Sequence, residues 1–246
     1  MAGFFRKFFS SQEEKKIPFC SAVVAAAGSS SRMEGKDKFF ELLGGTPLLA
    51  RTLLALEHCQ KIDEIVVVTR RDRLLYVSEL CRTFGITKAI KVIVGSDSRA
   101  KSVLCGLLEV SPQAQLIAIH DGARPFASPG LIASVVERAE EAGAAVPAIE
   151  LKDTIKIISG GQIESTPSRD SLVAVQTPQV FEAALIKAAL QKAVEESWNI
   201  TDDCGAVERL GMRISLVEGA PENIKLTTPA DFAMAEGILT LMEETV

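Results

Sequence analysis

The feature that most constrains the fold is a regular alternation of short apolar runs with longer amphipathic segments. The apolar runs read as strands and span Ala22–Ala27, Ile65–Thr69, Ile90–Val94, Leu116–His120 and Ala144–Ile149. Between them lie segments with apolar residues at the helical period, namely Pro47–His58, Asp72–Phe84, Arg99–Val110 and Pro129–Ala142. This pattern predicts an α/β fold with a Rossmann-like, doubly wound, mostly parallel sheet. In such a fold the ligand crevice lies at the carboxyl ends of the strands.

The segment from about residue 152 to 175 departs from this alternation. Two short β segments flank the turn at Ser159, Gly160 and Gly161 and predict an inserted β-hairpin arm. Because such an arm has little core of its own, we expect a homodimer formed through it. Two helices, a strand and a last helix are then expected at Val180–Glu196, Asp203–Leu210, Arg213–Val217 and Pro229–Met242, respectively. Residues 18–246 form one predicted domain, preceded by a flexible extension over residues 1–17.

The composition argues against nucleic-acid and membrane partners and favours a cytoplasmic location. The net charge is −5, whereas nucleic-acid binding normally needs a basic surface. The five cysteines are scattered and form no CxxC pair, which favours reduced thiols in a cytoplasmic protein over disulfides or zinc. No apolar run approaches the roughly 18 residues that span a bilayer, so stable membrane insertion is not expected. The N-terminus also lacks the unbroken apolar core of a signal peptide.

The first apolar run ends at Gly28 in a loop of small residues, with Arg32 and Lys38 downstream. A buried strand that opens into small residues presents backbone N–H groups to a ligand, which suits a polyphosphate. The two cations can neutralise the same ligand, arginine as a fork and lysine as a point charge. The alternative interpretation is an ordinary Ser/Gly-rich turn that joins a core strand to a helix.

Polar residues also follow the third and fourth predicted strands. Asp97 and Ser98 follow the third, where they could simply cap the next helix. Asp121 and Arg124 follow the fourth, where they could hold a divalent cation and an anionic substrate, or form a structural ion pair. Lys225 stands shortly before the last helix. Solvated surface charges have no reason to collect at strand ends, so these groups together favour a site.

Three other classes fail on residue type. Ser30 stands at the second glycine position of GxGxxG, which argues against a dinucleotide-dependent dehydrogenase. The sequence has no GxxxxGK[ST], so it is not a P-loop NTPase. His120 beside Asp121 suggests part of a catalytic triad, but no GxSxG elbow accompanies it, and hydrolase chemistry is not expected.

Five motifs carry a resemblance to one family. In chain order they are AAAGSSSRM with Lys38, GSDSRAKSV, HDGARP, QTPQVF and NIKLTTPADF. From about Cys20 to its end, the chain resembles the 2-C-methyl-D-erythritol 4-phosphate cytidylyltransferases of non-mevalonate isoprenoid biosynthesis. The resemblance implies a fold of the nucleotide-diphospho-sugar transferase type. It also implies transfer of a cytidylyl group from CTP to 2-C-methyl-D-erythritol 4-phosphate, with release of pyrophosphate and with Mg²⁺ or another divalent cation.

The resemblance further implies roles for individual residues. The cations implied at the reacting phosphates are Arg32, Lys38 and Lys225. The residues implied around the nucleotide are Ala26, Ala27, Gly28, Asp97, Ser102 and Gly122. The residues implied on the methylerythritol phosphate side are Asp121, Arg124, Thr154, Arg169 and Thr177, with Arg169 reaching across from a partner's arm. Asp121 is also the candidate metal ligand.

The sequence departs from the family pattern at a few positions. Ala25 replaces a proline, Ser30 replaces the second glycine, and Asp37 stands where a proline is usual before the lysine. Two other interpretations remain open. One is a cytidylyltransferase for another polyol phosphate, such as ribitol 5-phosphate, which shares the fold and most motifs. The other is a non-catalytic nucleotide-binding module.

Overall fold

A computed structural model of the chain describes residues 17–28, 33 and 37–244. Its centre is an eight-stranded sheet in the order β10-β7-β11-β6-β1-β4-β5, with β12 beside β7. The strands are β1 (Cys20–Ala26), β4 (Glu64–Thr69), β5 (Ala89–Val94), β6 (Leu116–Asp121), β7 (Ala144–Glu150), β10 (Val173–Val175), β11 (Gln179–Glu182) and β12 (Ser215–Glu218). Neighbours among β1, β4, β5 and β6 are parallel, as are β7 and β12, whereas β10 and β11 run antiparallel to the strands they contact.

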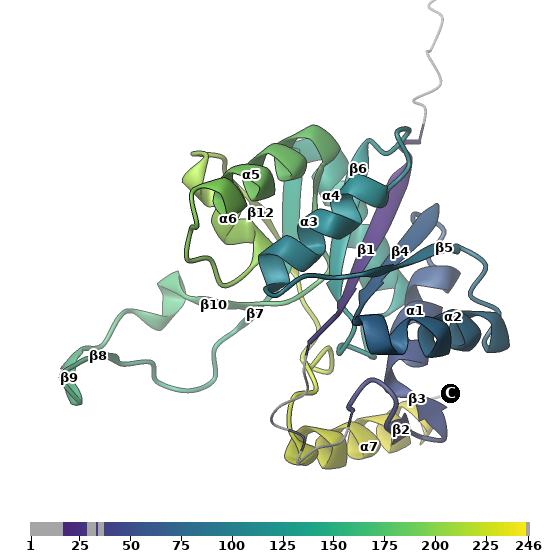
Figure 1. Ribbon diagram of the computed structural model, residues 1–246. Coiled ribbons are helices and arrows are strands. Elements are labelled where there is room, and N and C mark those ends of the chain that lie inside the picture. Colours follow the sequence, from purple (N-terminus) through teal and green to yellow (C-terminus); the bar gives the residue numbers. More distant parts are fainter. Residues whose placement is uncertain (1–16, 29–32, 34–36, 245–246) are drawn as a thin grey trace, which may run out of the picture.

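Helices cover both faces of this sheet (Figure 1). They are α1 (Leu48–His58), α2 (Leu74–Thr83), α3 (Arg99–Glu109), α4 (Pro129–Ala142), α5 (Ala183–Glu195), α6 (Asp203–Arg209) and α7 (Pro229–Glu244). Side chains of α1, α2, α4 and α7 join one core cluster, and those of α3, α5 and α6 join a second. Along β1, Val24 lies in the first cluster and Val23 in the second. The predicted doubly wound α/β fold is therefore confirmed.

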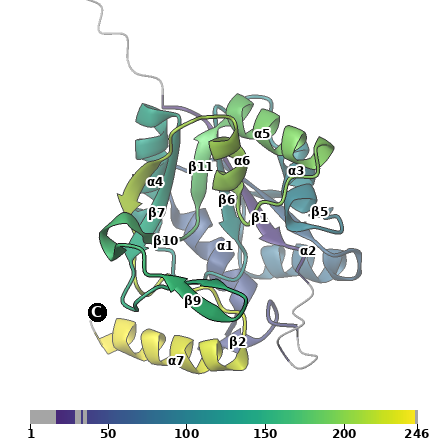
Figure 2. The same ribbon diagram turned by 90° about the vertical axis from the view of Figure 1, so that its left-hand side faces the viewer.

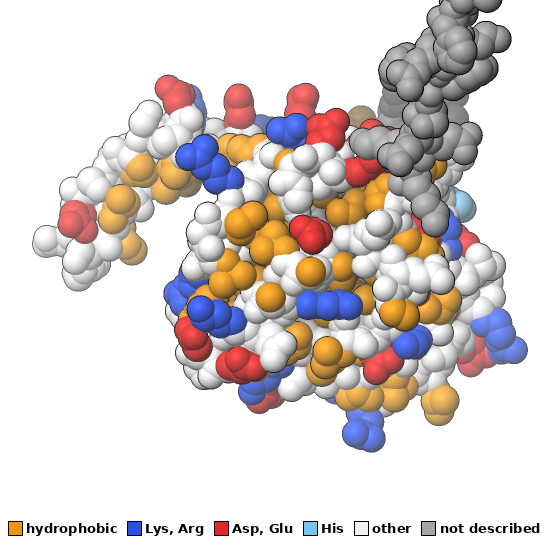
Figure 3. Space-filling view, turned by 90° about the horizontal axis from the view of Figure 1, so that it is seen from above, with side chains coloured by type: hydrophobic (Ala, Val, Ile, Leu, Met, Phe, Trp, Pro, Cys, Tyr) orange, Lys and Arg blue, Asp and Glu red, His pale blue; other side chains and the backbone are white. Residues whose placement is uncertain are grey.

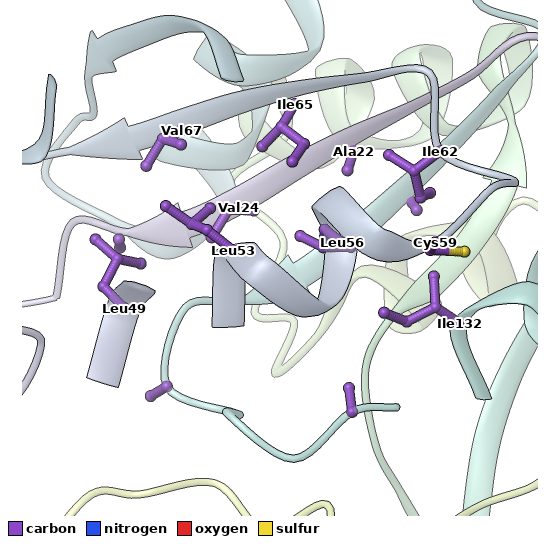
Figure 4. Close-up of a cluster of buried hydrophobic side chains, with 14 of the residues drawn as sticks. Ala22, Val24, Leu49, Leu53, Leu56, Cys59, Ile62, Ile65, Val67 and Ile132 are labelled. Carbon is purple, nitrogen blue, oxygen red and sulfur yellow. The ribbon is translucent and has the colours of Figure 1, made fainter. Parts of the chain in front are cut away.

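The first core holds β1 rigidly against α1 (Figure 4). Leu49, Leu53 and Leu56 recur at helical spacing and are fully buried over Ala22 and Val24. Truncating one such buried leucine to alanine costs about 2–5 kcal/mol. The carboxyl ends of the parallel strands are thereby fixed on the side of the sheet where α7 and the small β2 (Leu42–Leu43) and β3 (Thr46–Pro47) hairpin lie (Figure 1).

One predicted helix begins too early. The helix expected over Val180–Glu196 is α5, which starts at Ala183, because Gln179–Glu182 forms strand β11. Val180 packs into the first core and Phe181 into the second, so successive side chains point to opposite faces as in a strand. The apolar run is too short for periodicity to separate a buried strand from the start of a helix. The helix expected over Asp72–Phe84 also opens with a 3-10 turn, η1 (Arg71–Arg73), before α2.

The predicted hairpin arm is present and projects from the body of the molecule (Figures 1 and 2). Within the described part of the chain, its strands β8 (Ile157–Ser159) and β9 (Gln162–Ser165) pair only with each other. Gly160 and Gly161 turn the chain with φ of +57° and +79°, the left-handed conformation of a two-residue hairpin turn. After the 3-10 turn η2 (Arg169–Ser171), β10 rejoins the main sheet by pairing with β7.

The termini and the cysteines complete the description. The predicted extension over residues 1–17 lies outside the described residues except for Ile17, which is exposed. All five cysteines are free thiols, and four of them are buried. Within the described residues, every helix is too short or too polar to span a bilayer.

Candidate active site

A cavity of about 380 Å³ lies at the carboxyl ends of the strands. The end of β1, the loop before α3, the end of β6 and the segment before α7 all contribute to its walls. Seven predicted site residues line it, namely Ala27, Gly28, Lys38, Asp97, Ser102, Asp121 and Lys225. Side chains that are distant in sequence therefore meet at one edge of the sheet, as expected for an α/β fold.

A second cavity of about 150 Å³ adjoins the first. Arg124 and Thr177, both predicted on the polyol phosphate side, line this second cavity. The two cavities share three lining residues, Arg99, Asp121 and Lys225. These three residues form a common wall between the space lined by the predicted nucleotide residues and the space lined by the predicted substrate residues.

The two predicted catalytic lysines approach each other from opposite ends of the chain. Lys38 is buried, and its Nζ donates a hydrogen bond to the carbonyl oxygen of Leu226 at 3.0 Å. Leu226 in turn donates its N–H to the carbonyl oxygen of Ala123 at 2.9 Å, which ties this segment to the end of β6. Lys225, the residue before Leu226, lines the same cavity as Lys38. The predicted convergence of two cations on one cavity is thus observed.

Arg73 braces both ends of the loop that follows β1. It is buried at the start of α2, and its Nη1 donates to the carbonyl oxygen of Gly28 at 3.0 Å. Its guanidinium also forms an ion pair with Asp37, the residue before Lys38. This charge-assisted contact to a buried arginine holds the chain just before Lys38.

Asp121 is the electrostatic centre of the common wall. Its Oδ2 accepts a hydrogen bond from Lys225 Nζ at 2.8 Å, Arg99 Nε lies 3.5 Å from its Oδ1, and Arg124 Nε lies 3.7 Å from its Oδ2. Burial alone would raise the pKa of Asp121, but the charges of Arg99, Lys225 and Arg124 outweigh it and hold that pKa well below the usual range. Asp121 is therefore ionised at every physiological pH.

Arg99 is held most closely by a second carboxylate. Its Nη2 donates to Oδ2 of Asp203 at 2.7 Å, across from the first turn of α6. Asp203 is fully buried, so burial raises the pKa of its carboxyl, and the Arg99 charge opposes that rise. The side-chain oxygen of Gln179 accepts the backbone N–H groups of Asp203 and Cys204, at 3.1 and 3.0 Å. Asp203 is thus anchored at its backbone and directed at Arg99.

His120 is held by hydrogen-bond partners on both ring nitrogens and is closed off from a substrate. It is fully buried, and burial lowers its pKa to about 4, so the ring is neutral. Its Nε2 lies 3.3 Å from the carbonyl oxygen of Arg124, and its Nδ1 lies 3.0 Å from Oγ1 of Thr177. A neutral ring can donate to that carbonyl and accept from that hydroxyl at once. The hydroxyl oxygen also accepts the backbone N–H of Asp121 at 3.1 Å. Both ring nitrogens are therefore committed, which fits the absence of hydrolase motifs.

The loop before α3 combines a cap with a close backbone approach. Ser98 accepts the N–H of Lys101 at 3.3 Å, so it is the helix cap that the sequence offered as one interpretation of Asp97 and Ser98. Asp97 instead pairs with the amine of Lys101 at 3.0 Å on the cavity rim. A Cβ on Gly95 would lie 2.8 Å from both the Cβ of Ala27 and the Oγ of Ser102, so only glycine fits there.

Several predicted residues do not line either cavity. Ala26 is buried in the first core, and Gly122 packs so tightly that an added Cβ would lie 3.1 Å from the Cβ of Ala26. Thr154 and Arg169 are exposed on the arm, away from both cavities. Arg32 lies outside the described residues. Ala26 and Gly122 therefore belong to the packed interior next to the strand ends, whereas the arm residues line neither cavity of their own chain.

The site also contains residues that the motif analysis did not assign. Arg99 belongs to the same strand-end segment as Asp97, so the rule that cations gather at strand ends could have found it. Asp203 gave no comparable signal, because an aspartate at the start of a helix is most often a cap or a favourable first-turn charge. Only tertiary packing, in which α6 lies on α5 and α5 on α3, turns it toward Arg99.

Fold and site together define a nucleotidyltransferase of the α/β class. The family model for 2-C-methyl-D-erythritol 4-phosphate cytidylyltransferase matches residues 20–241. The chain is 44% identical over 224 residues to that enzyme of Halalkalibacterium halodurans, covering 91% of this chain and 98% of the relative. It is 42% identical over 219 residues to that of Dehalococcoides mccartyi, covering 89% and 95%. The chain belongs to the 2-C-methyl-D-erythritol 4-phosphate cytidylyltransferase family.

Solved structures agree with this assignment. The crystal structure of 4-diphosphocytidyl-2C-methyl-D-erythritol synthase from Anaerococcus prevotii matches with a TM-score of 0.81 and 32% identity, over 91% of this chain and 96% of that one. The 2-C-methyl-D-erythritol 4-phosphate cytidylyltransferase of Thermus thermophilus matches with a TM-score of 0.72 and 31% identity, over 89% and 98%. The similarity spans about nine tenths of this chain and nearly the whole length of both solved chains.

Proposed function

We propose that this protein transfers the cytidylyl group of CTP to 2-C-methyl-D-erythritol 4-phosphate and releases pyrophosphate. A phosphate oxygen of the polyol forms a bond to the α-phosphorus of CTP. The bond from that phosphorus to the oxygen bridging toward the β-phosphorus breaks, and its electron pair leaves with pyrophosphate. Family membership supports this reaction. The structural observation that carries it is the convergence of Lys38 and Lys225 on one cavity at the strand ends.

The geometry suits a reaction that needs charge neutralisation and no general base. The attacking phosphate oxygen is already ionised at neutral pH, and His120, the one histidine near the site, is neutral and fully engaged. The difficulty is that two anions must meet while charge builds on the α-phosphate and on the leaving pyrophosphate. Cations aimed at the places where that charge builds stabilise the transition state. We assign this role to Lys38, Lys225 and Arg32.

The residues that the structure describes do not form a magnesium site made of protein ligands. Among the described residues, no group of three or more His, Cys, Asp and Glu side chains could hold a metal ion. Asp121, the predicted ligand, already faces Lys225, Arg99 and Arg124, and a cation approaching it would be repelled by all three. We propose that a divalent cation binds mainly to the triphosphate oxygens, which prefer hard cations. No step above depends on it.

We also propose that two copies associate through the arm and complete each other's sites. Ile158 and Ile163 lie on the two strands of the hairpin and are 70% and 66% exposed, and Figure 3 shows hydrophobic side chains along the projecting arm. An isolated two-stranded hairpin is marginal in water, so a covering subunit would stabilise it. Arg169, which bonds only Lys152 among the described residues, would then bind the polyol phosphate in the partner's site.

The free thiols support a cytoplasmic location.

Pyrophosphate release tests the proposed reaction directly. The purified protein is incubated with Mg²⁺, CTP and, in separate reactions, 2-C-methyl-D-erythritol 4-phosphate, ribitol 5-phosphate or no acceptor. We expect release with the first acceptor, at a kcat/KM well above that with ribitol 5-phosphate. A higher kcat/KM with ribitol 5-phosphate would contradict the proposed acceptor. CTP binding without turnover on either acceptor would instead support a non-catalytic module.

A further inference from the structure

We infer that Arg99, anchored by Asp203, is a positioning residue that keeps Asp121 in place and charge-compensated when Lys225 turns from Asp121 to a substrate phosphate. This inference rests on the proposed function, because it assigns Lys225 to the reacting phosphates. It concerns two residues that lie outside the predicted catalytic set.

Lys225 is committed to Asp121 in the structure. The amine lies 2.8 Å from Oδ2 of Asp121, and the lysine side chain is 40% exposed, so it can reorient. Asp121 has an exposed side-chain fraction of only 9%, so water compensates poorly for a lost cation there. Removing one partner of a buried ion pair is costly because the remaining charge stays desolvated. Movement of Lys225 toward a phosphate therefore requires other cations at Asp121.

Arg99 and Arg124 are those cations, and they balance the cluster once Lys225 has left. Five ion-paired groups form the cluster: Arg99, Arg124, Lys225, Asp121 and Asp203. With Lys225 included, three positive charges face two negative ones. With Lys225 engaged by a phosphate, two positive charges face two negative ones, and the buried remainder is neutral. Lys225 carries the surplus charge and is thus the cation that the cluster can release to an anionic substrate.

Asp203 determines where Arg99 stands. Arg99 reaches Asp203 at 2.7 Å but Asp121 only at 3.5 Å, so its stronger contact is to Asp203. Asp203 cannot shift easily, because Gln179 holds its backbone N–H and because it is fully buried. Nearby Asp202 is occupied separately, by Gln179 and as the cap of α6. The anchored guanidinium therefore stays beside Oδ1 of Asp121 and leaves Oδ2 to the amine of Lys225, which lies 2.8 Å from it.

Arg99 neutralises the buried carboxylate of Asp203 and also lies beside Asp121. A charge-balanced pair of substitutions separates these two roles. Arg99→Gln leaves Asp203 buried without a cation, so it should lower the melting temperature and also slow turnover. Asp203→Asn frees Arg99 from its anchor. The double variant R99Q/D203N removes one charge of each sign and should restore the melting temperature. If Arg99 acts on Asp121, the double variant should still turn over slowly.

The test measures kcat and KM for CTP and for 2-C-methyl-D-erythritol 4-phosphate by pyrophosphate release, with melting temperature beside each value. We expect kcat to fall about 10- to 100-fold in R99Q and in R99Q/D203N, the scale of a small misplacement of reacting groups. The matched control is R138Q/E141Q, which removes an exposed ion pair on α4 in the same charge-balanced way. That control should keep both kcat and melting temperature.

Three outcomes decide the matter. A double variant that regains wild-type kcat together with its melting temperature would reduce Arg99 to a structural residue and overturn the inference. Wild-type turnover in R99Q alone would overturn it as well. If the wild-type protein releases no pyrophosphate, the proposed function fails instead, and the dissociation constant for CTP decides the inference. About tenfold weaker CTP binding in the stable double variant would support the inference, because Lys225 would then stay with Asp121 and CTP would lose one charged hydrogen bond. Unchanged CTP binding would overturn it.

Discussion

The strand-end site and the β-arm hold their predicted substrate residues under opposite physical conditions. At the strand ends, Asp121 and Arg124 are largely buried and bonded to partners on other elements of the same chain. On the arm, Thr154 and Arg169 are exposed, and Arg169 donates one hydrogen bond, to the carbonyl oxygen of Lys152 at 3.1 Å. Buried charges interact strongly and exposed ones weakly, since solvent screens them.

This difference separates what one subunit can do from what an assembly can do. The strand-end cluster is largely preorganised, because its cations lie at one rim before any substrate arrives and Arg99 is anchored there by Asp203. The arm has no such support within the chain, so its contribution depends on a surface that covers it. Substitutions at the strand ends should therefore change the chemical step, and substitutions on the arm should change substrate binding and association.

The largest effect is expected at the catalytic lysines. Lys38→Ala or Lys225→Ala should lower kcat by about 100-fold or more, as loss of one charge-stabilising donor typically does. Steady-state pyrophosphate release measures this. Lys61→Ala, which removes a half-buried lysine that is paired with Glu137 and lines neither cavity, is the matched control and should keep its turnover. Near-normal kcat in either site variant would remove that lysine from the mechanism.

A smaller and differently distributed effect is expected on the arm. Arg169→Ala should raise KM for the polyol phosphate about tenfold and change kcat less, because a charged hydrogen bond to substrate is lost. Lys156→Ala, on the same arm, is the control, since its amine bonds Thr166 within the arm. Equal losses in kcat and kcat/KM would indicate a role in the transition state and would break the contrast drawn above.

Mixed subunits test whether Arg169 acts across the interface. In a mixture of K225A and R169A subunits, a mixed dimer has one site with an intact Lys225 and an intact Arg169 from the partner. Activity should therefore rise above that of either variant alone after the subunits exchange. A mixture that only averages the two separate activities would show that the arm serves its own subunit.

Burial of His120 beside the site should make the free energy of unfolding depend on pH, whereas the arm has no buried titratable group of this kind among the described residues. The pKa of His120 is about 4 in the folded protein, below the unfolded value near 6.5, so the unfolded state binds more protons between these values. This contribution to stability is complete above about pH 6.5 and is lost as the pH falls toward 4, by up to about 1.4 kcal/mol per pH unit. Urea unfolding of the wild type and His120→Gln at several pH values measures it. Identical pH slopes would contradict a neutral, buried His120.

The smallest effect on protomer stability is expected from exposed arm residues. Ile158→Asp combined with Ile163→Asp should change the free energy of unfolding by no more than about 0.5 kcal/mol per site, because both side chains are exposed in a single chain. The same change should dissociate a dimer held by the arm, which sedimentation equilibrium measures. A dimer of unchanged affinity would place the interface elsewhere.

The sequence predicted much of this molecule where the signals are local. Helix α4 was predicted over Pro129–Ala142 and is observed there, because Ser128 caps its first turn and Gly143 ends it with a φ of +78°. The strand-end rule likewise placed Lys38 and Lys225 at one rim. By contrast, β11 was missed, since its buried residues lie between two helical layers and their faces depend on what covers them.

The sequence by itself determined most of the strands and helices, the arm and the rim where polar groups gather, because periodicity, caps and turns act over a few residues. Tertiary structure alone decided which charges meet. Arg99 and Asp203 are 104 positions apart, and nothing local links them. Their contact depends on how α3 and α6 pack on one face of the sheet, and the strength of a charge pair depends on the burial that such packing creates.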